Sequence, residues 1–215
     1  MTFTLGYQIA AHSPVQVMVE RVKLIEEAGL DVMWAGDHFH PWFHTGAQEP
    51  QSWVFIAATA ARTYSIKLGT SVTAPTFRYH PAIVAQTFAT LGIMFPGRIM
   101  LGLGTGEAMN EIPLGYEWPS FKERVERLEE AVQIIKLLWS QEFVNYRGKY
   151  YRLKKARLYS KPEMKIPLYI AAFGATVAKL AGKYADGFIT PSANQQHIRD
   201  ILFPAIADGA RENGR

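Results

Sequence analysis

The stretch LDVMWAGDHFHPW, residues 30–42, decides the fold. Residues 30–35 are a short apolar run, which predicts a buried parallel strand. Pro41 prevents the chain beyond it from continuing as helix or strand without a turn. In α/β barrels and open α/β sheets, ligands bind just past the C-terminal ends of the strands. The side chains that follow the strand therefore form a candidate active-site loop: Asp37, His38, His40 and Trp42.

Composition limits the classes of protein that remain. A chain of 215 residues that is 48% hydrophobic and 20% charged predicts one folded domain with a sizeable core. The net charge is +4 and the basic residues are scattered, so neither nucleic acid nor a membrane is an expected partner. The chain has no cysteine, which fits a cytoplasmic protein and excludes thiolate metal sites. The N-terminus lacks the pattern of a signal peptide, and no apolar run is long enough to span a bilayer.

Strand and helix patterns alternate along the whole chain. We expect strands at residues 3–9, 30–35, 66–74, 98–103, 167–172 and 187–190. Helices are expected between Pro14 and Gly29 and at residues 52–62, 81–95, 120–139, 175–184 and 195–211. Residues 143–158, with Gly148 at the centre, predict a hairpin.

Two of the helix starts carry capping signals. Ser13 is the expected N-cap of the first helix, with Pro14 in its first turn. Ser120 and Glu123 predict a capping box at the start of the long helix. The expected buried stripe of that helix consists of Phe121, Val125, Leu128, Val132, Ile135 and Trp139.

The order of elements predicts an α/β fold. Six consecutive βα units indicate a parallel sheet with helices outside it. A complete (β/α)8 barrel usually takes about 250 residues. The chain is therefore expected to form either an open α/β sheet or a barrel that lacks its last quarter.

A second polar motif, GLGTGEAMNE at residues 102–111, also follows a predicted strand. Its glycines at positions 102, 104 and 106 would let a flat ligand or a phosphate approach the backbone, and Glu107 would lie at the strand's mouth. The spacing matches neither a dinucleotide fingerprint nor a P-loop. The alternative is a tight turn after a buried strand.

Three further features leave alternatives open. The small residues 171–176 fit either an anion site at a helix N-terminus or ordinary strand–helix packing. Arg78 could pair with a phosphate or a carboxylate, or lie in solvent. The pair formed by His38 and His40 is not expected to bind a metal, because later strands supply few further histidines.

Together these motifs resemble the deazaflavin (coenzyme F-420)-dependent dehydrogenases of the bacterial luciferase-like superfamily. The matching stretches are residues 37–42, 76–90, 104–111 and 167–172, and the resemblance runs from the first strand to the last residue. It is strongest to the glucose-6-phosphate and secondary-alcohol dehydrogenases of that family. The resemblance implies a TIM (β/α)8 barrel of luciferase-like type, here truncated after about six βα units, as a single partial-barrel domain over residues 1–215. It also implies a homodimer when the chain is full length.

The resemblance further implies a site for coenzyme F-420, with FMN the less favoured cofactor, and no metal. The implied cofactor contacts are Asp37, Ser71, Val72, Thr105, Gly106, Asn110 and, for the phosphate, Gly174, Ala175, Thr176 and Val177. A non-proline cis peptide is implied between Ser71 and Val72, behind the deazaflavin ring.

The implied reaction moves a hydride between a secondary alcohol or sugar (phosphate) and the coenzyme. His38 is the expected base for the hydroxyl proton. Glu107 could supply a proton to the reduced ring if burial keeps its carboxyl protonated, and Trp42 would orient the substrate. Residues 190–195 contain no lysine or arginine, where sugar-phosphate members carry a lysine, which favours an uncharged alcohol. An FMN-dependent monooxygenase, or a cofactor-binding fragment without turnover, remains as an alternative.

Overall fold

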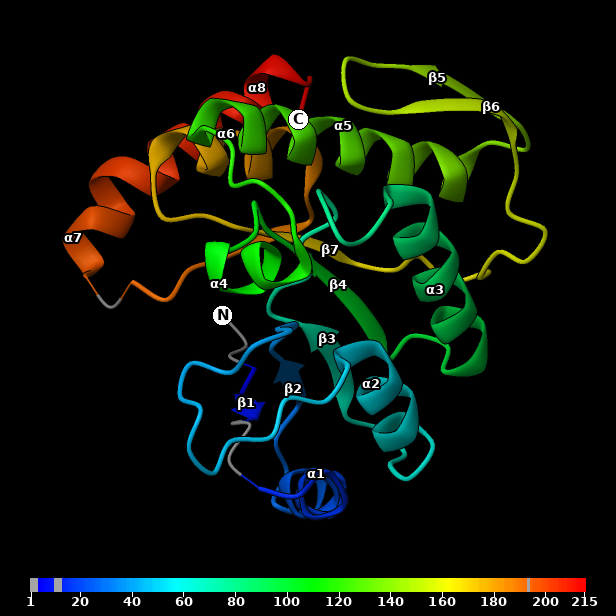
Figure 1. The fold of residues 1–215 in the computed structure, drawn as a ribbon, viewed down its shortest axis with the longest axis vertical. Coiled ribbons are helices and arrows are strands. Elements are labelled where there is room, and N and C mark those ends of the chain that lie inside the picture. Colours follow the sequence, from blue (N-terminus) through cyan, green and yellow to red (C-terminus); the bar gives the residue numbers. More distant parts are fainter. Residues whose placement is uncertain (1–3, 10–12, 193) are drawn as a thin grey trace.

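A six-stranded parallel sheet forms the centre of the molecule. The computed structural model describes residues 4–9, 13–192 and 194–215. The strands lie in the order β1 (Gly6–Ile9), β2 (Val32–Ala35), β3 (Lys67–Thr70), β4 (Ile99–Leu103), β7 (Leu168–Ala171) and β8 (Gly187–Ile189). The sheet curls into part of a barrel, with the helices on its outer side (Figure 1). The expected partial TIM barrel is thus confirmed.

The helices cover the outer face of the sheet and bury its side chains. They are α1 (Val15–Glu27), α2 (Ser52–Ala60), α3 (Pro81–Met94), α5 (Phe121–Ser140), α6 (Ala175–Tyr184) and α8 (Phe203–Glu212). Two short turns, α4 (Ala108–Glu111) and the 3-10 helix η1 (Ile112–Leu114), follow β4. The run before α8 consists of α7 (Gln195–His197) and the π-helical turn η2 (Ile198–Leu202). In the part of the chain that the structure describes, no helix is long and apolar enough to cross a membrane.

Helix starts account for two corrections to the sequence-based expectations. The N-cap of α1 is Pro14 and not Ser13, so no side chain caps that helix. At α5, the hydroxyl of Ser120 does accept the N–H of Glu123, at 3.3 Å. The carboxylate of Glu123 does not complete the capping box, because it pairs with Arg127 one turn further on, at 2.7 Å.

The buried stripe of α5 also differs at its first residue. Phe121 is exposed, and Val125 and Trp139 are partly buried against the core. The buried residues of the helix begin at Leu128 and continue through Val132 and Ile135 as expected. A helix packs along a sheet only where a neighbouring element covers it, and the apolar spacing alone does not show where that cover begins.

A two-stranded antiparallel hairpin lies against α5. It is formed by β5 (Val144–Arg147) and β6 (Arg152–Ala156). The Glu130 carboxylate on α5 accepts backbone N–H groups of the hairpin turn, at 2.7 Å from Lys149 and 3.1 Å from Tyr150. A Cβ at Gly148 would overlap that carboxylate, so the turn needs glycine to approach α5 this closely.

Helices α6 and α8 touch through their backbones. A Cβ built on Gly182 would overlap the carbonyl oxygen of Ile206, and a Cβ built on Gly209 would overlap the carbonyl oxygen of Lys179. Each helix therefore contributes one glycine that admits the other's backbone. The contact seats the C-terminal helix on α6, next to the end of the sheet.

Candidate active site

The C-terminal ends of the strands surround a cavity of about 570 Å³. This volume lies within the range of about 300–1,000 Å³ that is usual for ligand pockets. The loops after β2, β3, β4, β7 and β8 all contribute to the wall. Its lining residues include Gln8, Asp37, His38, Trp42, Ser71, Val72, Thr105, Gly106, Glu107, Asn110, Phe173 and Ile189.

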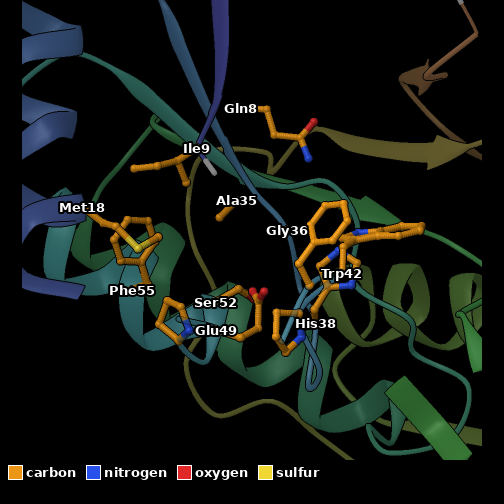
Figure 2. Close-up of a pocket in the computed structure, with 13 residues that line it drawn as sticks. Gln8, Ile9, Met18, Ala35, Gly36, His38, Trp42, Glu49, Ser52 and Phe55 are labelled. Atoms are coloured by element: carbon orange, nitrogen blue, oxygen red, sulfur yellow. The ribbon is translucent and has the colours of Figure 1, made fainter. Parts of the chain in front are cut away.

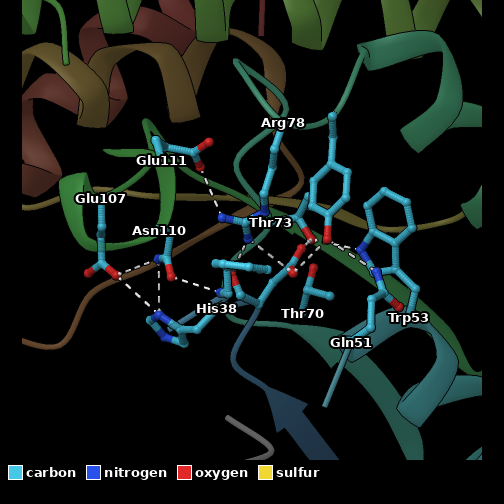
Figure 3. Close-up of polar contacts among 12 residues, drawn as sticks. His38, Gln51, Trp53, Thr70, Thr73, Arg78, Glu107, Asn110 and Glu111 are labelled. Carbon is cyan, nitrogen blue, oxygen red and sulfur yellow. Dashed lines mark hydrogen bonds and ion pairs between the residues drawn. The ribbon is translucent and has the colours of Figure 1, made fainter. Parts of the chain in front are cut away.

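Asp37 is the buried anchor of the loop that follows β2. Its carboxylate accepts the Thr73 hydroxyl at 2.6 Å and pairs with the Arg78 guanidinium at 3.2 Å (Figure 3). The same guanidinium donates to the backbone carbonyl of Asp37 and to the Glu111 carboxylate, the latter at 2.9 Å. One arginine thus ties the loop after β2 to the turn α4 after β4.

Arg78 is therefore neither a solvated side chain nor a free anchor for a ligand phosphate. Its side chain is 7% exposed, and its two carboxylate partners are 1% and 0% exposed. Burial raises the pKa of Glu111, and the charge of Arg78 lowers it in part. Of the alternatives that the sequence left open, the structure selects pairing with protein carboxylates.

His38 lies at the centre of a polar cluster with Glu107 and Asn110. The Asn110 amide oxygen accepts the backbone N–H of Phe39 at 2.8 Å, and that of His40 at 3.3 Å. This fixes the amide so that its NH₂ group faces the His38 ring, 3.2 Å from Nδ1. The Glu107 carboxylate lies 3.3 Å from the same Nδ1 (Figure 3). The two strand-end motifs predicted from the sequence therefore meet at one ring nitrogen.

The charges around His38 favour its protonated form. Burial of the ring lowers the pKa of His38, but the hydrogen bond and charge of Glu107, together with the charges of Glu49 and Asp37, outweigh burial. The pKa of His38 is therefore raised from its ordinary value. A ring held in this way can take up a proton near neutral pH.

Two of the predicted catalytic side chains remain open to solvent. The Trp42 side chain is 66% exposed, and its ring lies edge-on to His38 at a centroid distance of 6.1 Å. The Glu107 side chain is 43% exposed. The burial that was assumed for a protonated Glu107 is therefore not found here, and its role as an acid stays a prediction.

The loop after β3 carries the expected non-proline cis peptide, between Ser71 and Val72. Both residues line the cavity. A Cβ at Gly104 would lie 2.6 Å from the Val72 side chain, and a Cβ at Gly102 would overlap the carbonyl oxygen of Thr70. Packing against β3 thus requires these two glycines without any ligand, while Gly106 needs glycine for its φ of 85°.

The predicted phosphate residues lie at the N-terminus of α6 and not on the described cavity wall. Gly174 is the N-cap and has no capping side chain, and Ala175 begins the helix. Thr176 is exposed and Val177 is buried. Phe173, directly before them, lines the cavity. The first backbone N–H groups of α6 have no partner within the helix, which a phosphate could use, and phosphate binding by these residues stays a prediction.

Sequence patterns missed several lining residues. Gln8 and Ile189 line the cavity from strands that predict only structure. Glu49, in a segment without periodicity, lines an adjoining cavity of about 310 Å³, to which His38 also contributes. Gln8 could have been found, because it is a polar residue near the C-terminal end of an apolar strand. Over the described ranges 4–9, 13–192 and 194–215, no cluster of three or more histidine, aspartate or glutamate side chains could hold a metal ion.

Comparisons with known proteins agree on one family. The sequence profile of the family described as luciferase-like monooxygenase matches residues 1–215. The F420-dependent glucose-6-phosphate dehydrogenase of Nocardia farcinica is 49% identical over 215 residues, which are 98% of this chain and 64% of that protein. The protein of the same name from Microbacterium testaceum is 49% identical over 193 residues, 89% of this chain and 57% of that protein.

Solved structures show the same relationship. An F420-dependent secondary alcohol dehydrogenase, in complex with an F420-acetone adduct, has a TM-score of 0.95 and 41% identity, covering 100% of this chain and 66% of that one. The coenzyme F420-dependent tetrahydromethanopterin reductase of Methanopyrus kandleri has a TM-score of 0.85 and 25% identity, covering 99% and 62%. The chain spans 64% of the length of the Nocardia relative. On the profile match and these identities, the chain belongs to the luciferase-like monooxygenase family, in which it is similar to F420-dependent dehydrogenases.

Proposed function

We propose that the protein oxidises a secondary alcohol to a carbonyl compound and transfers the hydride to coenzyme F-420. The observation that carries this proposal is the meeting of His38 and Glu107 on the wall of the 570 Å³ cavity. The names of the relatives support the same reaction class.

The residues on the cavity wall fit a deazaflavin. The lining of the cavity includes the apolar side chains of Val72 and Ala74, in the loop after β3, and of Ala171, at the end of β7. The polar side chains of Thr105 and Asn110 lie on the same wall. The backbone N–H groups at the start of α6 follow Phe173, which is on the wall, and would hold the phosphate of the cofactor. When bound there, the coenzyme supplies hydride-transfer chemistry.

His38 is the base in this proposal. The His38 ring takes the proton of the substrate hydroxyl, and the Glu107 carboxylate, 3.3 Å from Nδ1, stabilises the charged ring. Trp42 borders the same space and would orient the substrate.

We further propose that the substrate is an uncharged secondary alcohol and not a sugar phosphate. Arg78 is the one lysine or arginine among the described lining residues of the larger cavity, and two buried carboxylates already pair with it. The described residues of the loop after β8 bring no lysine or arginine. Because similar proteins are named glucose-6-phosphate dehydrogenases, glucose-6-phosphate has to be tested as a substrate beside the alcohol.

The test is reduction of coenzyme F-420, followed by the loss of its absorbance, in protein produced from the complete reading frame. We expect turnover with 2-propanol, little with glucose-6-phosphate, and a loss of roughly a hundredfold or more in kcat in His38→Asn. Turnover with glucose-6-phosphate alone would reverse the substrate assignment. Fluorescence titration with F-420 separates failure to bind from binding without turnover.

Three related predictions stay predictions. They are a homodimeric full-length protein, a cytoplasmic location, and use of F-420 in preference to FMN. The solved FMN-containing relative is 18% identical, so it supports only the fold.

A further inference from the structure

The adjoining cavity of about 310 Å³ shares part of its wall with the larger one. Its lining comes from β1, β2, α1, α2 and the loop between β2 and α2. Gln8, His38 and Trp42 line both cavities. The two cavities therefore meet at the ring of the proposed base.

The far end of this smaller cavity is apolar. Figure 2 shows Met18 and Phe55 at the end away from Trp42. The apolar end belongs to the core between the sheet and the helices, and its side chains are at most 7% exposed: Ile9, Met18, Ala35 and Phe55. An apolar cavity inside a protein binds hydrocarbon groups, because they leave water when they enter it.

The remaining wall of the smaller cavity is polar and carries Glu49 and Ser52. Ser52 is 1% exposed, and its hydroxyl has no hydrogen-bond partner among the described residues. A buried hydroxyl without a partner is uncommon and indicates that another molecule enters this part of the cavity. The described wall has no lysine or arginine, so apart from the His38 ring it offers no cation to a phosphate.

The His38 ring turns its free edge towards the wall of the smaller cavity. Its Nδ1 already faces the Asn110 amide at 3.2 Å and the Glu107 carboxylate at 3.3 Å. The other edge lies over Gly36, which is on the wall of the smaller cavity, because a Cβ built there would be 3.2 Å from Nε2. Nε2 is therefore the ring nitrogen that a substrate hydroxyl can reach without displacing Asn110 or Glu107.

We propose that the smaller cavity binds the hydrocarbon substituent of the alcohol, while the larger cavity holds the coenzyme. This inference rests on the proposed function and narrows its substrate class to secondary alcohols with an apolar chain or ring on one side of the reacting carbon. A sugar phosphate carries no such substituent. Each methylene that leaves water for the smaller cavity should strengthen binding about fourfold.

The first test needs neither coenzyme nor turnover. In NMR of the protein with labelled methionine methyl groups, 2-hexanol should shift the signal of Met18, which is assigned through Met18→Leu. The same concentration of 2-propanol should shift it less. Met164 is the control, because it lines a separate cavity of about 340 Å³ beside α5. No shift at Met18, or an equal shift at Met164, would overturn the inference.

The second test compares substrates in protein from the complete reading frame. From 2-propanol to 2-hexanol, kcat/KM should rise about fourfold for each added methylene. Ala35→Leu places a larger side chain in the cavity and should lower the ratio of the two values by about tenfold or more. Phe55→Leu enlarges the apolar end and should move the optimum to a longer chain. Val54→Leu is the matched control on the exposed side of α2 and should leave the ratio unchanged.

The ratio of the two kcat/KM values does not depend on the fraction of folded enzyme, so a destabilised variant still reports on the cavity. Equal values for 2-propanol and 2-hexanol in the wild type, or a ratio that Ala35→Leu leaves unchanged, would overturn the inference. A wild type that binds F-420 but reduces it with no alcohol removes the proposed function instead. The Met18 signal then decides alone whether the smaller cavity binds hydrocarbon.

Discussion

Removing Arg78 should destabilise the protein far more than removing a surface arginine. In Arg78→Met, two carboxylates that are 1% and 0% exposed lose their only cation among the described residues. Breaking a buried ion pair by removing one partner costs about 3–5 kcal/mol, because the remaining charge stays buried. For a chain of this size each kcal/mol lowers Tm by roughly 2–4 °C, so Tm should fall by roughly 6–20 °C.

The loss of stability in Arg78→Met should depend on pH through the pKa of Glu111. Burial raises the pKa of Glu111 and Arg78 lowers it, so the pKa of Glu111 rises further in Arg78→Met. A carboxyl with a raised pKa in the folded state binds more protons there than in the unfolded state. Its contribution to stability is present below its unfolded pKa and is lost as the pH rises. The deficit of the variant should therefore shrink as the pH falls from 7 towards about 4.5.

The assay is urea unfolding, followed by tryptophan fluorescence at pH 7 and at pH 5. Arg157→Met is the matched control, because the Arg157–Glu142 pair spans 3.0 Å with side chains 35% and 68% exposed. An exposed pair of this kind should contribute about 0–1 kcal/mol. Arg78→Met combined with Glu111→Gln should recover part of the loss. If Arg78→Met costs no more than Arg157→Met, the buried cluster does not hold the loop after β2 as argued.

Three further predictions follow from single contacts. Gly36→Ala should displace the His38 ring, because the new Cβ would lie 2.9 Å from Cδ2. NMR should then show a changed titration of His38. An unchanged titration would show that Gly36 is not needed to hold the ring in place. Glu26→Gln should cost about 1.5–3 kcal/mol at pH 7, because the Glu26 carboxylate accepts the backbone N–H of Ile66 at 2.8 Å among other donors. Although burial raises the pKa of Glu26, these hydrogen bonds lower it overall, so this stability is lost as the pH falls and wild type and variant should converge in acid urea titrations. Ser120→Ala should cost about 1 kcal/mol in the same assay, and no loss would show that the cap at α5 is not stabilising.

Much of the fold could be predicted from the sequence because its strands are short apolar runs with turn residues at both ends. Helix α6 (Ala175–Tyr184) begins and ends where its spacing predicts. The meeting of His38 and Glu107 followed from one rule, that parallel strands end at the same edge of a sheet. The capping of α1 and the exposure of Phe121 did not follow, because they depend on which neighbour covers each helix end.

The rest of the site depends on contacts that no spacing encodes. Arg78 lies 41 residues after its partner Asp37 in the chain, and nothing in either segment specifies the pairing. Glu49 lines a cavity together with His38 from an irregular loop, which has no periodicity that could predict its place. Gly102 and Gly104 suggested a ligand, yet the path of β3 already requires them. The residue types indicated where the chemistry takes place. Only the folded structure shows which of these side chains pair with one another.

The backbone contact between α6 and α8 limits how these two helices can change in evolution. Any side chain at position 182 or 209 would have to separate the helices, and no rotamer relieves an overlap that begins at Cβ. Substitution of either glycine is therefore excluded unless the whole C-terminal helix is repositioned. A saturation library should accept almost nothing at these two positions while tolerating broad variety at the exposed Glu212 nearby.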